Sequence, residues 1–361
     1  MSGRSTSTRS VTAFFALVLL LAPDVFAGEL RRWVDANGQV HISDGAPPVG
    51  ARGGSSAGTG AVTTVPSAAA SPIQRGRGAG KYTLGLLWRI EPVADGGGAR
   101  VEPSYVFGTM HSADPRVRNL KPDVERTFHD ATSFCAEATL DGSALLSVGH
   151  RMMIGDGRSL DQILGADLYG EVAPLMEARG MPDAFLPMLQ PWVVLLSLSM
   201  PASATGSQPG DILDVDLMNR AQADGKTVCG LETLDEQIDA VSKIPERDLI
   251  ANIRSAAKAA AGLEAVYAKA TELYVQEDLA GLAALDAGES GDAGERRRAA
   301  DFERRLLDDR NVRMVDRMAS RIDRGGAFIA IGAGHLGGER GVLALLERRG
   351  YAVKRVTPVA P

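Results

Sequence analysis

The stretch that decides the fold is Phe328-Ile329-Ala330-Ile331-Gly332-Ala333-Gly334-His335. Its apolar part, 327–331, is short and stops at a glycine, which is typical of a buried strand. Similar β-prone runs occur at 104–107, 133–137, 227–231 and 351–356. Because helical patterns fill the segments between these runs, the alternation predicts an α/β fold. We expect a mixed, largely parallel sheet with a large helical insertion, preceded by a small β-hairpin unit.

Two apolar stripes in the second half of the chain predict helices. The first recurs at spacings of four and three and comprises Leu249, Ile253, Ala256, Ala260, Leu263, Tyr267, Ala270 and Tyr274. The second comprises Phe302, Leu306, Val315, Met318 and Ile322. The first spacing predicts one long helix, and we interpret both stripes as core-facing packing. The glycine- and charge-rich segment 286–298 is expected to form a loop between these helices.

The composition excludes several classes of protein. Of the 361 residues, 45% are hydrophobic, 23% charged and 5% aromatic. These values fit a globular chain and exclude collagen-like, wholly disordered and polytopic membrane proteins. The 45 acidic and 39 basic residues give a net charge of -6 without a long run of either sign. We therefore expect no nucleic-acid partner, and small molecules or proteins remain.

The first 27 residues have the pattern of a secretory signal peptide. Arg4 and Arg9 form a positively charged start, an apolar stretch covers 11–21, and small or apolar residues precede a cleavage point after Ala27. Eleven apolar residues are well short of the roughly 20 that a membrane-spanning helix needs. We expect cleavage, export to the periplasm or beyond, and no membrane span in the mature chain.

Three further units are expected after the signal peptide. Residues 28–49 form a small β-hairpin domain, since two β-prone segments flank the dipeptide Asn37-Gly38. The pattern Trp-Val-Asp-x-x-Gly-x-x-His-x-Ser-Asp at 33–44 resembles a short domain of unknown function in secreted bacterial proteins. Glycine, alanine, serine, threonine and proline dominate 50–80, which predicts a disordered linker. The main α/β domain covers 81–358.

Two of the five histidines occur in the same local frame. Gly108-Thr109-Met110-His111 follows the first predicted strand of the main domain, and Gly332-Ala333-Gly334-His335 follows the fourth. Each Gly-x-x-His frame therefore lies at the carboxyl end of a strand, where open α/β sheets place their ligand crevices. Glycine at such a point lets the chain leave the sheet sharply and lets a ligand or a second loop approach the backbone.

Together with other motifs, these frames resemble the TraB/GumN family. The resemblance covers about 81–357 and rests on Tyr105 to His111, Phe134 to Glu137, Gly230 to Gln237, Asp309-Arg310-Asn311 and Phe328 to Gly338. It implies an α/β fold with a helical insertion. In the Tiki branch of the family it implies a divalent-metal peptidase that uses both Gly-x-x-His histidines and a glutamate. By motif position these residues are His111, His335 and Glu137.

Residues of these types can bind a divalent metal ion and activate water. Two imidazoles and one carboxylate leave an open position on a divalent ion (Mn, Co, Zn or Fe), where a bound water is acidified and a substrate carbonyl polarised. Alternatively, Glu137 is the general base and Glu232 the third ligand. Arg310 is the candidate for stabilising an oxyanion or holding a substrate carboxylate, with Asp309 and Asn311 as additional site residues. We expect the ring nitrogens of His111 and His335 to lie about 3–5 Å apart, with Glu137 in the same cleft.

Each candidate also has a purely structural interpretation. Either histidine could be a loop residue, Glu137 an edge charge and Arg310 a structural ion pair. Glu232 could be a carboxylate favoured by a helix N-terminus. Cys135 and Cys229, which both fall in strand-like segments, could pair in an oxidising compartment or be small buried hydrophobic residues.

Two functions of different class follow. The first is a periplasmic, divalent-metal-dependent hydrolase of the peptidase type, acting on a peptide or another small envelope substrate. The second is a non-catalytic periplasmic protein that binds a peptide or a component of an envelope polysaccharide. The sequence contains no His-Glu-x-x-His motif and no recognisable nucleophile elbow, so the common protease frameworks do not apply.

Overall fold

A computed structural model describes residues 31–34, 40–43, 81–93, 101–139, 142–206, 212–286 and 292–357. The predicted signal peptide at 1–27 and linker at 50–80 lie outside these residues. Strands β1 (Arg31–Val34) and β2 (Val40–Ser43) pair in antiparallel fashion, with Trp33 opposite His41. The predicted hairpin strands are therefore present.

A six-stranded mixed sheet forms the centre of the main domain, with the order β6-β5-β7-β4-β3-β8. Its strands are β3 (Leu87–Pro92), β4 (Ser104–Thr109), β5 (Ser133–Ala138), β6 (Thr227–Glu232), β7 (Ala327–Gly332) and β8 (Tyr351–Arg355). Strands β6, β5, β7 and β4 run parallel to one another, whereas β3 is antiparallel to both β4 and β8. The predicted mixed, largely parallel sheet is confirmed.

Strand β3 was not among the strands predicted from the sequence. Strand β3 mixes the charged residues Arg89 and Glu91 with buried Trp88 and Ile90 and ends on a proline. This pattern lacks the continuous apolar run of a central strand, yet β3 lies between β4 and β8. The other five strands lie where they were predicted, within two residues at each end.

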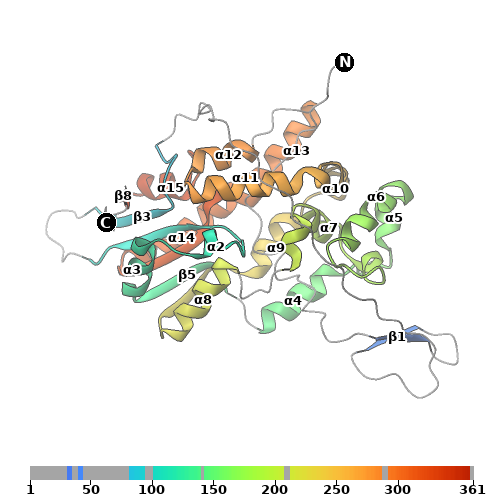
Figure 1. Cartoon of the computed structure of the whole chain (residues 1–361), viewed down its shortest axis with the longest axis horizontal. Coiled ribbons are helices and arrows are strands. Elements are labelled where there is room, and N and C mark those ends of the chain that lie inside the picture. Colours follow the sequence, from blue (N-terminus) through green and yellow to red (C-terminus); the bar gives the residue numbers. More distant parts are fainter. Residues whose placement is uncertain are drawn as a thin grey trace.

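Helices surround the sheet and extend beyond it (Figure 1). They are α2 (Pro115–Arg118), α3 (Pro122–Asp130), α4 (Gly142–Met152), α5 (Leu160–Leu164), α6 (Ala166–Glu177), α7 (Pro191–Leu198), α8 (Leu213–Ala223), α9 (Leu234–Ser242), α10 (Glu246–Ala259), α11 (Leu263–Val275), α12 (Leu279–Asp286), α13 (Ala293–Glu303), α14 (Asp309–Ile322) and α15 (Val342–Arg348). Short turns η2 (Leu186–Met188), η3 (Ala202–Gly206), η5 (Ala260–Gly262), η6 (Arg304–Asp308) and η7 (Ala333–His335) complete the order.

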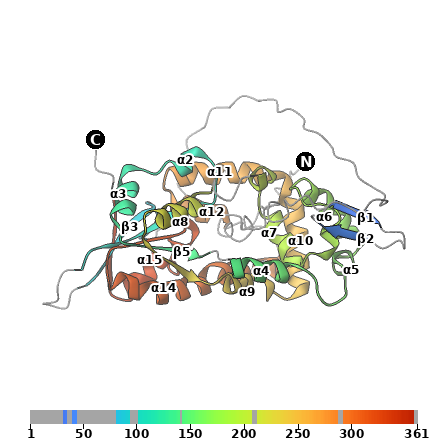
Figure 2. The same cartoon turned by 90° about the horizontal axis from the view of Figure 1, so that it is seen from below.

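The sheet is covered on both faces. Helices α3 and α8 lie on one side and α14 lies on the other (Figure 2). On the α3 side, Phe128 packs edge-on against Phe134 of β5 and Phe328 of β7, with ring centroids 5.9 and 5.4 Å apart. Because side chains alternate along a strand, Cys135 and Glu137 point to the opposite face, toward α14. This alternation decides which helix can reach Glu137.

Two separate hydrophobic cores meet within the domain. One surrounds the sheet, and the other fills the helical part formed by α4 to α7, α9 and α10. The continuous run from α13 through η6 to α14 contributes to both cores, since Phe302 and Leu306 belong to the helical core whereas Met314 and Met318 belong to the sheet core. Residues 307–313 therefore lie at the junction of the two cores.

Two predictions about the helices were wrong in detail. The stripe from Leu249 to Tyr274 is not one helix, because α10 ends at Ala259 and α11 starts at Leu263, after the short turn that contains Gly262. Glycine is costly inside a helix, which favours a break at that point. The predicted loop at 286–298 is shorter than expected, since Asp292 and Glu295 form a reciprocal capping box that starts α13 at Ala293. Among the described residues, no helix combines the length and apolar character needed to cross a membrane.

Cys135 and Cys229 form a disulfide between neighbouring strands β5 and β6. The two residues lie directly opposite each other in the parallel register. The bond therefore joins two strands that are 94 residues apart in sequence. It ties together the strands that carry Glu137 and Glu232.

Removal of this disulfide should lower stability substantially. The double variant Cys135→Ala/Cys229→Ala is expected to lose about 2–4 kcal/mol of unfolding free energy, because a long loop of the unfolded chain is no longer constrained. Urea unfolding of the variant and of the parent, each with and without a reducing agent, measures this loss. The reduced parent should approach the variant, and equal midpoints under oxidising conditions would contradict the expectation.

Candidate functional site

Three adjacent parallel strands deliver the predicted residues to one edge of the sheet. Glu137 lies at the end of β5, His335 follows β7 and His111 follows β4. Because these strands are parallel neighbours, their carboxyl ends share an edge. All three side chains are buried. The structure thus places the two Gly-x-x-His frames and the glutamate at the same end of the sheet.

Gly108 allows the two Gly-x-x-His frames to pack against each other. A Cβ atom at this position would lie 2.6 Å from Cδ1 of Leu336 and 3.2 Å from Cα of Ala333. Any side chain would therefore push η7, which carries His335, away from the end of β4. The glycine permits the close approach of a second loop, which is one of the two reasons that the sequence suggested for it.

Glu137 is held from two sides. Its Oε1 atom accepts a hydrogen bond from the backbone N–H of Gly332 at 2.7 Å, and its Oε2 atom lies 2.6 Å from Nη2 of Arg310. Burial by itself would raise the pKa of Glu137, but the charges of Arg310 and the two histidines lower it to about 2. The carboxylate is therefore ionised at neutral pH and fixed in position.

The ring of His335 is oriented by a side-chain amide. Its Nδ1 atom lies 2.6 Å from Oδ1 of Asn311, whose Nδ2 atom donates to the carbonyl of Arg340 at 3.0 Å. Since the amide oxygen is the acceptor, Nδ1 carries the ring proton and Nε2 presents a lone pair. Burial lowers the pKa of His335 to about 4, so the ring is neutral at neutral pH.

This orientation turns Nε2 of His335 toward the carboxylate of Glu137. Among the described residues the atom has no hydrogen-bond partner, although it is buried and lies 3.6 Å from Oε1 of Glu137. A neutral imidazole lone pair thus faces an ionised carboxylate with no donor between them. Such an arrangement is unfavourable unless a cation or a proton is shared between the two groups.

His111 is held in a similar way. Its Nδ1 atom lies 2.5 Å from Oδ2 of Asp214, whose other carboxylate oxygen, Oδ1, accepts a hydrogen bond from the hydroxyl of Thr109. The backbone carbonyl of His111 accepts a bond from the hydroxyl of Tyr267 at 2.7 Å. Burial alone would lower the pKa of His111, but the charges of Asp214 and Glu137 and the bond to Asp214 raise it. Asp214 is a site residue that sequence reasoning missed, because no motif links α8 to the Gly-x-x-His frames.

Arg310 holds the two glutamates together. Its Nη2 atom lies 2.6 Å from Glu137 and 2.7 Å from Glu232, and its Nε atom donates to Glu232 at 2.8 Å. Glu232 also accepts a bond from Arg313 at 2.7 Å. Arg310 is only 3% exposed and lies at the junction of the two cores. These contacts favour a positioning role for Arg310, and its direct contact with an oxyanion or a substrate stays a prediction.

The remaining candidates differ in their placement. Glu137, and not Glu232, is the carboxylate beside His335, while Glu232 is engaged by two arginines. Asn311 belongs to the site as the partner of His335. Asp309 is exposed and forms an ion pair with Arg304.

Within the part of the chain that the structure describes, no group of three or more His, Cys, Asp or Glu residues is arranged to hold a metal ion as the side chains stand. The three-ligand site therefore stays a prediction.

The fold and the site define a class of α/β protein with a buried His–Glu–Arg cluster at the carboxyl edge of a mixed sheet. The chain belongs to the TraB/PrgY/gumN family, whose model matches residues 86–355. A second model, a domain of unknown function (DUF4124), matches residues 17–75 and includes the predicted hairpin unit. The resemblance inferred from the motifs is confirmed.

Two curated relatives are both named metalloprotease TIKI2. The protein from Danio rerio is 24% identical over 311 residues, which cover 72% of this chain and 59% of the relative. The protein from Xenopus tropicalis is 23% identical over 321 residues, which cover 74% of this chain and 59% of the relative. This chain therefore spans about three fifths of the length of these relatives. No solved structure matches it.

Proposed function

We propose that this protein is a divalent-metal-dependent hydrolase that cleaves peptides in the periplasm. The observation that carries the proposal is the arrangement of the two buried histidines. Each is held through Nδ1 by a side-chain oxygen, from Asp214 or from Asn311, and Nε2 of His335 faces the ionised carboxylate of Glu137. Metal-ligating histidines are commonly fixed in this way through the ring nitrogen that does not bind the ion.

The residues present fit a divalent ion in their chemistry. His111, His335 and Glu137 would hold it, since imidazole nitrogens and a carboxylate are ligands that suit Zn, Mn, Co and Fe. On binding, His111 would give up the proton that its raised pKa favours. The buried Nε2 atom of His335, which lacks a hydrogen bond among the described residues, is the expected donor. When bound, such an ion polarises a substrate carbonyl as a Lewis acid.

The protein's own residues have separate roles in this proposal. Glu137 is assigned as a ligand rather than the general base, because an efficient base needs a pKa nearer to the working pH than about 2. Arg310 keeps Glu137 ionised and fixed, and Asn311 sets the tautomer of His335. These groups are positioning residues, since they act through the ligands.

Three further observations support the peptide substrate and the compartment. The relatives named metalloprotease give the reaction class that we propose here. The disulfide between Cys135 and Cys229 is of a kind that persists in oxidising compartments such as the periplasm. The signal-peptide pattern at 1–27 agrees with export.

A turnover assay with metal removal tests this function. The purified protein should cleave members of a set of fluorogenic peptides, lose turnover on chelation, and regain it with Mn, Co, Zn or Fe. Asp309→Asn, which alters only the exposed neighbour of Arg310, should behave as the parent does. Turnover that survives complete chelation would contradict metal dependence. Peptide binding without cleavage in the metal-loaded protein would favour the non-catalytic binding protein.

Loss of the amide that orients His335 should weaken metal binding. In Asn311→Leu the new side chain has a similar shape but cannot accept a hydrogen bond from Nδ1–H of His335. The imidazole ring then loses its fixed tautomer. We expect a 10- to 100-fold lower metal affinity, the usual effect of removing such a partner. Asn311→Asp keeps an acceptor and should retain most of the affinity. Competition with a chromogenic chelator measures both, and equal affinities for Asn311→Leu and the parent would show that Asn311 does not act through His335.

A further inference from the structure

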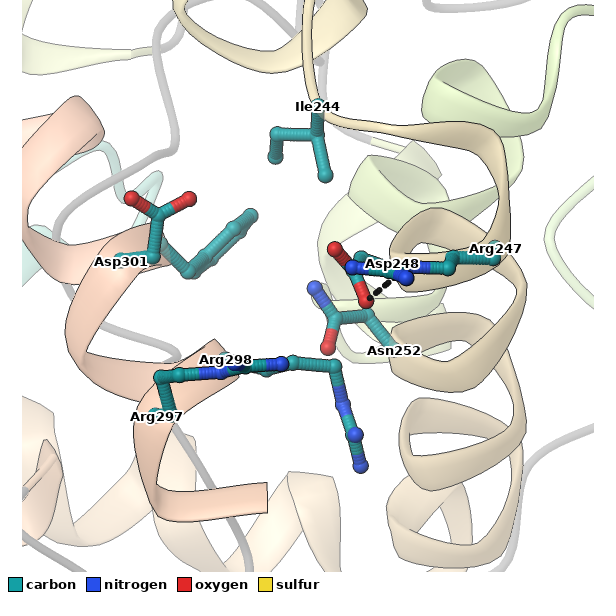
Figure 3. A pocket seen from close by; sticks show the side chains of 8 residues that line it. Ile244, Arg247, Asp248, Asn252, Arg297, Arg298 and Asp301 are labelled. Atoms are coloured by element: carbon teal, nitrogen blue, oxygen red, sulfur yellow. Dashed lines mark ion pairs between the residues drawn. The ribbon is translucent and has the colours of Figure 1, made fainter. Parts of the chain in front are cut away.

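A second candidate binding site lies in the helical part of the domain. A cavity of about 230 Å³ opens between α10 and α13. Figure 3 shows Arg247, Asp248 and Asn252 projecting from α10 toward Asp301 and the arginines of α13. Because one water molecule needs only about 10–15 Å³ of such space, the cavity has room for a small organic molecule.

The polar lining of the cavity carries more positive than negative charge. Asp301 is already engaged by Arg304 at 2.6 Å and by Arg305 at 2.8 Å, and Asp248 lies 3.4 Å from Arg247. By contrast, within the described segments the side chains of Arg297 and Arg298 form no hydrogen bond or ion pair, although Arg298 lies close enough to Asp292 to lower the pKa of that carboxyl. Arg247, Arg297 and Arg298 outnumber Asp248 and Asp301 in the lining, so the cavity has a net attraction for anions.

The cavity also has an apolar wall. Phe302 and Ile244 are both buried and line it from the two sides. The amide of Asn252, which has no hydrogen-bond partner in the described part of the chain, adds a neutral polar group. A ligand that matches this lining combines an oxyanion with an apolar group.

We infer that this cavity binds a carboxylate or phosphate group attached to an apolar moiety, with Arg297 and Arg298 as the anion ligands. Arginine forks match both oxyanions in planar, paired hydrogen bonds. The site is separate from the cluster at Glu137. Phe302 precedes Arg310 by eight residues of nearly continuous helix, or about 12 Å at 1.5 Å per residue. The inference does not depend on hydrolysis.

Calorimetric titration of the purified protein tests the site with defined probes. The probes are inorganic phosphate, the acetylated dipeptide acetyl-Leu-Phe with a free carboxylate, and the same dipeptide as its amide. The test variant is Arg297→Gln/Arg298→Gln. The matched control is Arg254→Gln/Lys258→Gln, which removes two exposed positive charges from α10 without altering the cavity lining.

We expect the free-acid dipeptide to bind more tightly than its amide, and the test variant to lose at least tenfold in affinity while the control retains it. Binding of phosphate with the same dependence on Arg297 and Arg298, but not of the dipeptide, would support the site with phosphate as the anion. The absence of binding by every probe at millimolar concentration would overturn the inference. Equal affinities of the test variant and the parent would overturn it as well.

Discussion

Glu137→Gln should abolish most peptide turnover, with a loss of at least about a hundredfold. The variant keeps the shape of the side chain, and its amide oxygen can still accept the bond from Gly332. It removes the negative charge that faces Nε2 of His335. Removal of a residue that hydrogen-bonds to a metal ligand usually lowers metal affinity or activity about 10- to 100-fold. Removal of the charge of a ligand itself should therefore lower activity further. Single-turnover and steady-state assays on fluorogenic peptides measure the effect.

A matched variant separates this role from a general effect of charge. Glu246→Gln makes the same chemical change at an exposed glutamate. Oε2 of Glu246 forms an ion pair with Nη2 of Arg158 at 2.8 Å. Its turnover should equal that of the parent, because exposed ion pairs contribute only about 0–1 kcal/mol to stability. Equal turnover in Glu137→Gln and Glu246→Gln would remove Glu137 from the catalytic site.

Arg310→Met is expected to destabilise the fold by about 3–5 kcal/mol, because it leaves buried Glu137 without its main counter-charge. The contacts of 2.6 and 2.7 Å to the two glutamates are lost together. Removing both members of the pair, in Arg310→Met/Glu137→Gln, should recover part of the stability, since no unpaired buried charge then remains. Chemical denaturation of the parent, both single variants and the double variant measures the coupling. An Arg310→Met variant as stable as the parent would contradict this interpretation.

The pH dependence of this loss has a definite sign. In the parent the pKa of Glu137 is lowered to about 2 from the ordinary value of 4.5. The ionised form therefore contributes stability that is present above about pH 4.5 and is lost as the pH falls through about 2. In Arg310→Met, burial without the arginine raises the pKa of Glu137, so the variant protonates at higher pH. The stability difference between parent and variant should be largest near neutrality and should shrink in acid.

Much of the fold was predictable because it depends on local patterns. Short β-prone runs bounded by glycine or turn residues predicted five of the six strands of the main sheet. Strand β3 was missed because Arg89 and Glu91 interrupt its apolar pattern, and only its partners β4 and β8 reveal it as a central strand. The break at Gly262 had a local signal that the apolar stripe outweighed, and the capping box at Asp292 had one that the glycine- and charge-rich composition outweighed.

The site was partly predictable for a different reason. The Gly-x-x-His frames and Glu137 follow strand ends, and the parallel pairing of those strands places them at one edge. Asp214 could not be paired with His111 from sequence, since it comes from a helix more than 100 residues away. Arg310 lies off the apolar stripe of α14, so the stripe alone does not indicate where its side chain lies. It is buried because the helix passes between two cores at that point.

Titration with metal ions tests directly whether His111 and His335 bind a divalent ion. Metal-stripped protein should be titrated with Zn, Mn, Co and Fe, and the same titration repeated with His111→Ala, His335→Ala and the exposed control His129→Ala. One equivalent of ion should bind to the parent and to the control, and both site variants should bind at least a hundredfold more weakly. A parent that binds no stoichiometric ion, or a His111→Ala variant that binds as the parent does, would contradict metal binding by the histidine pair.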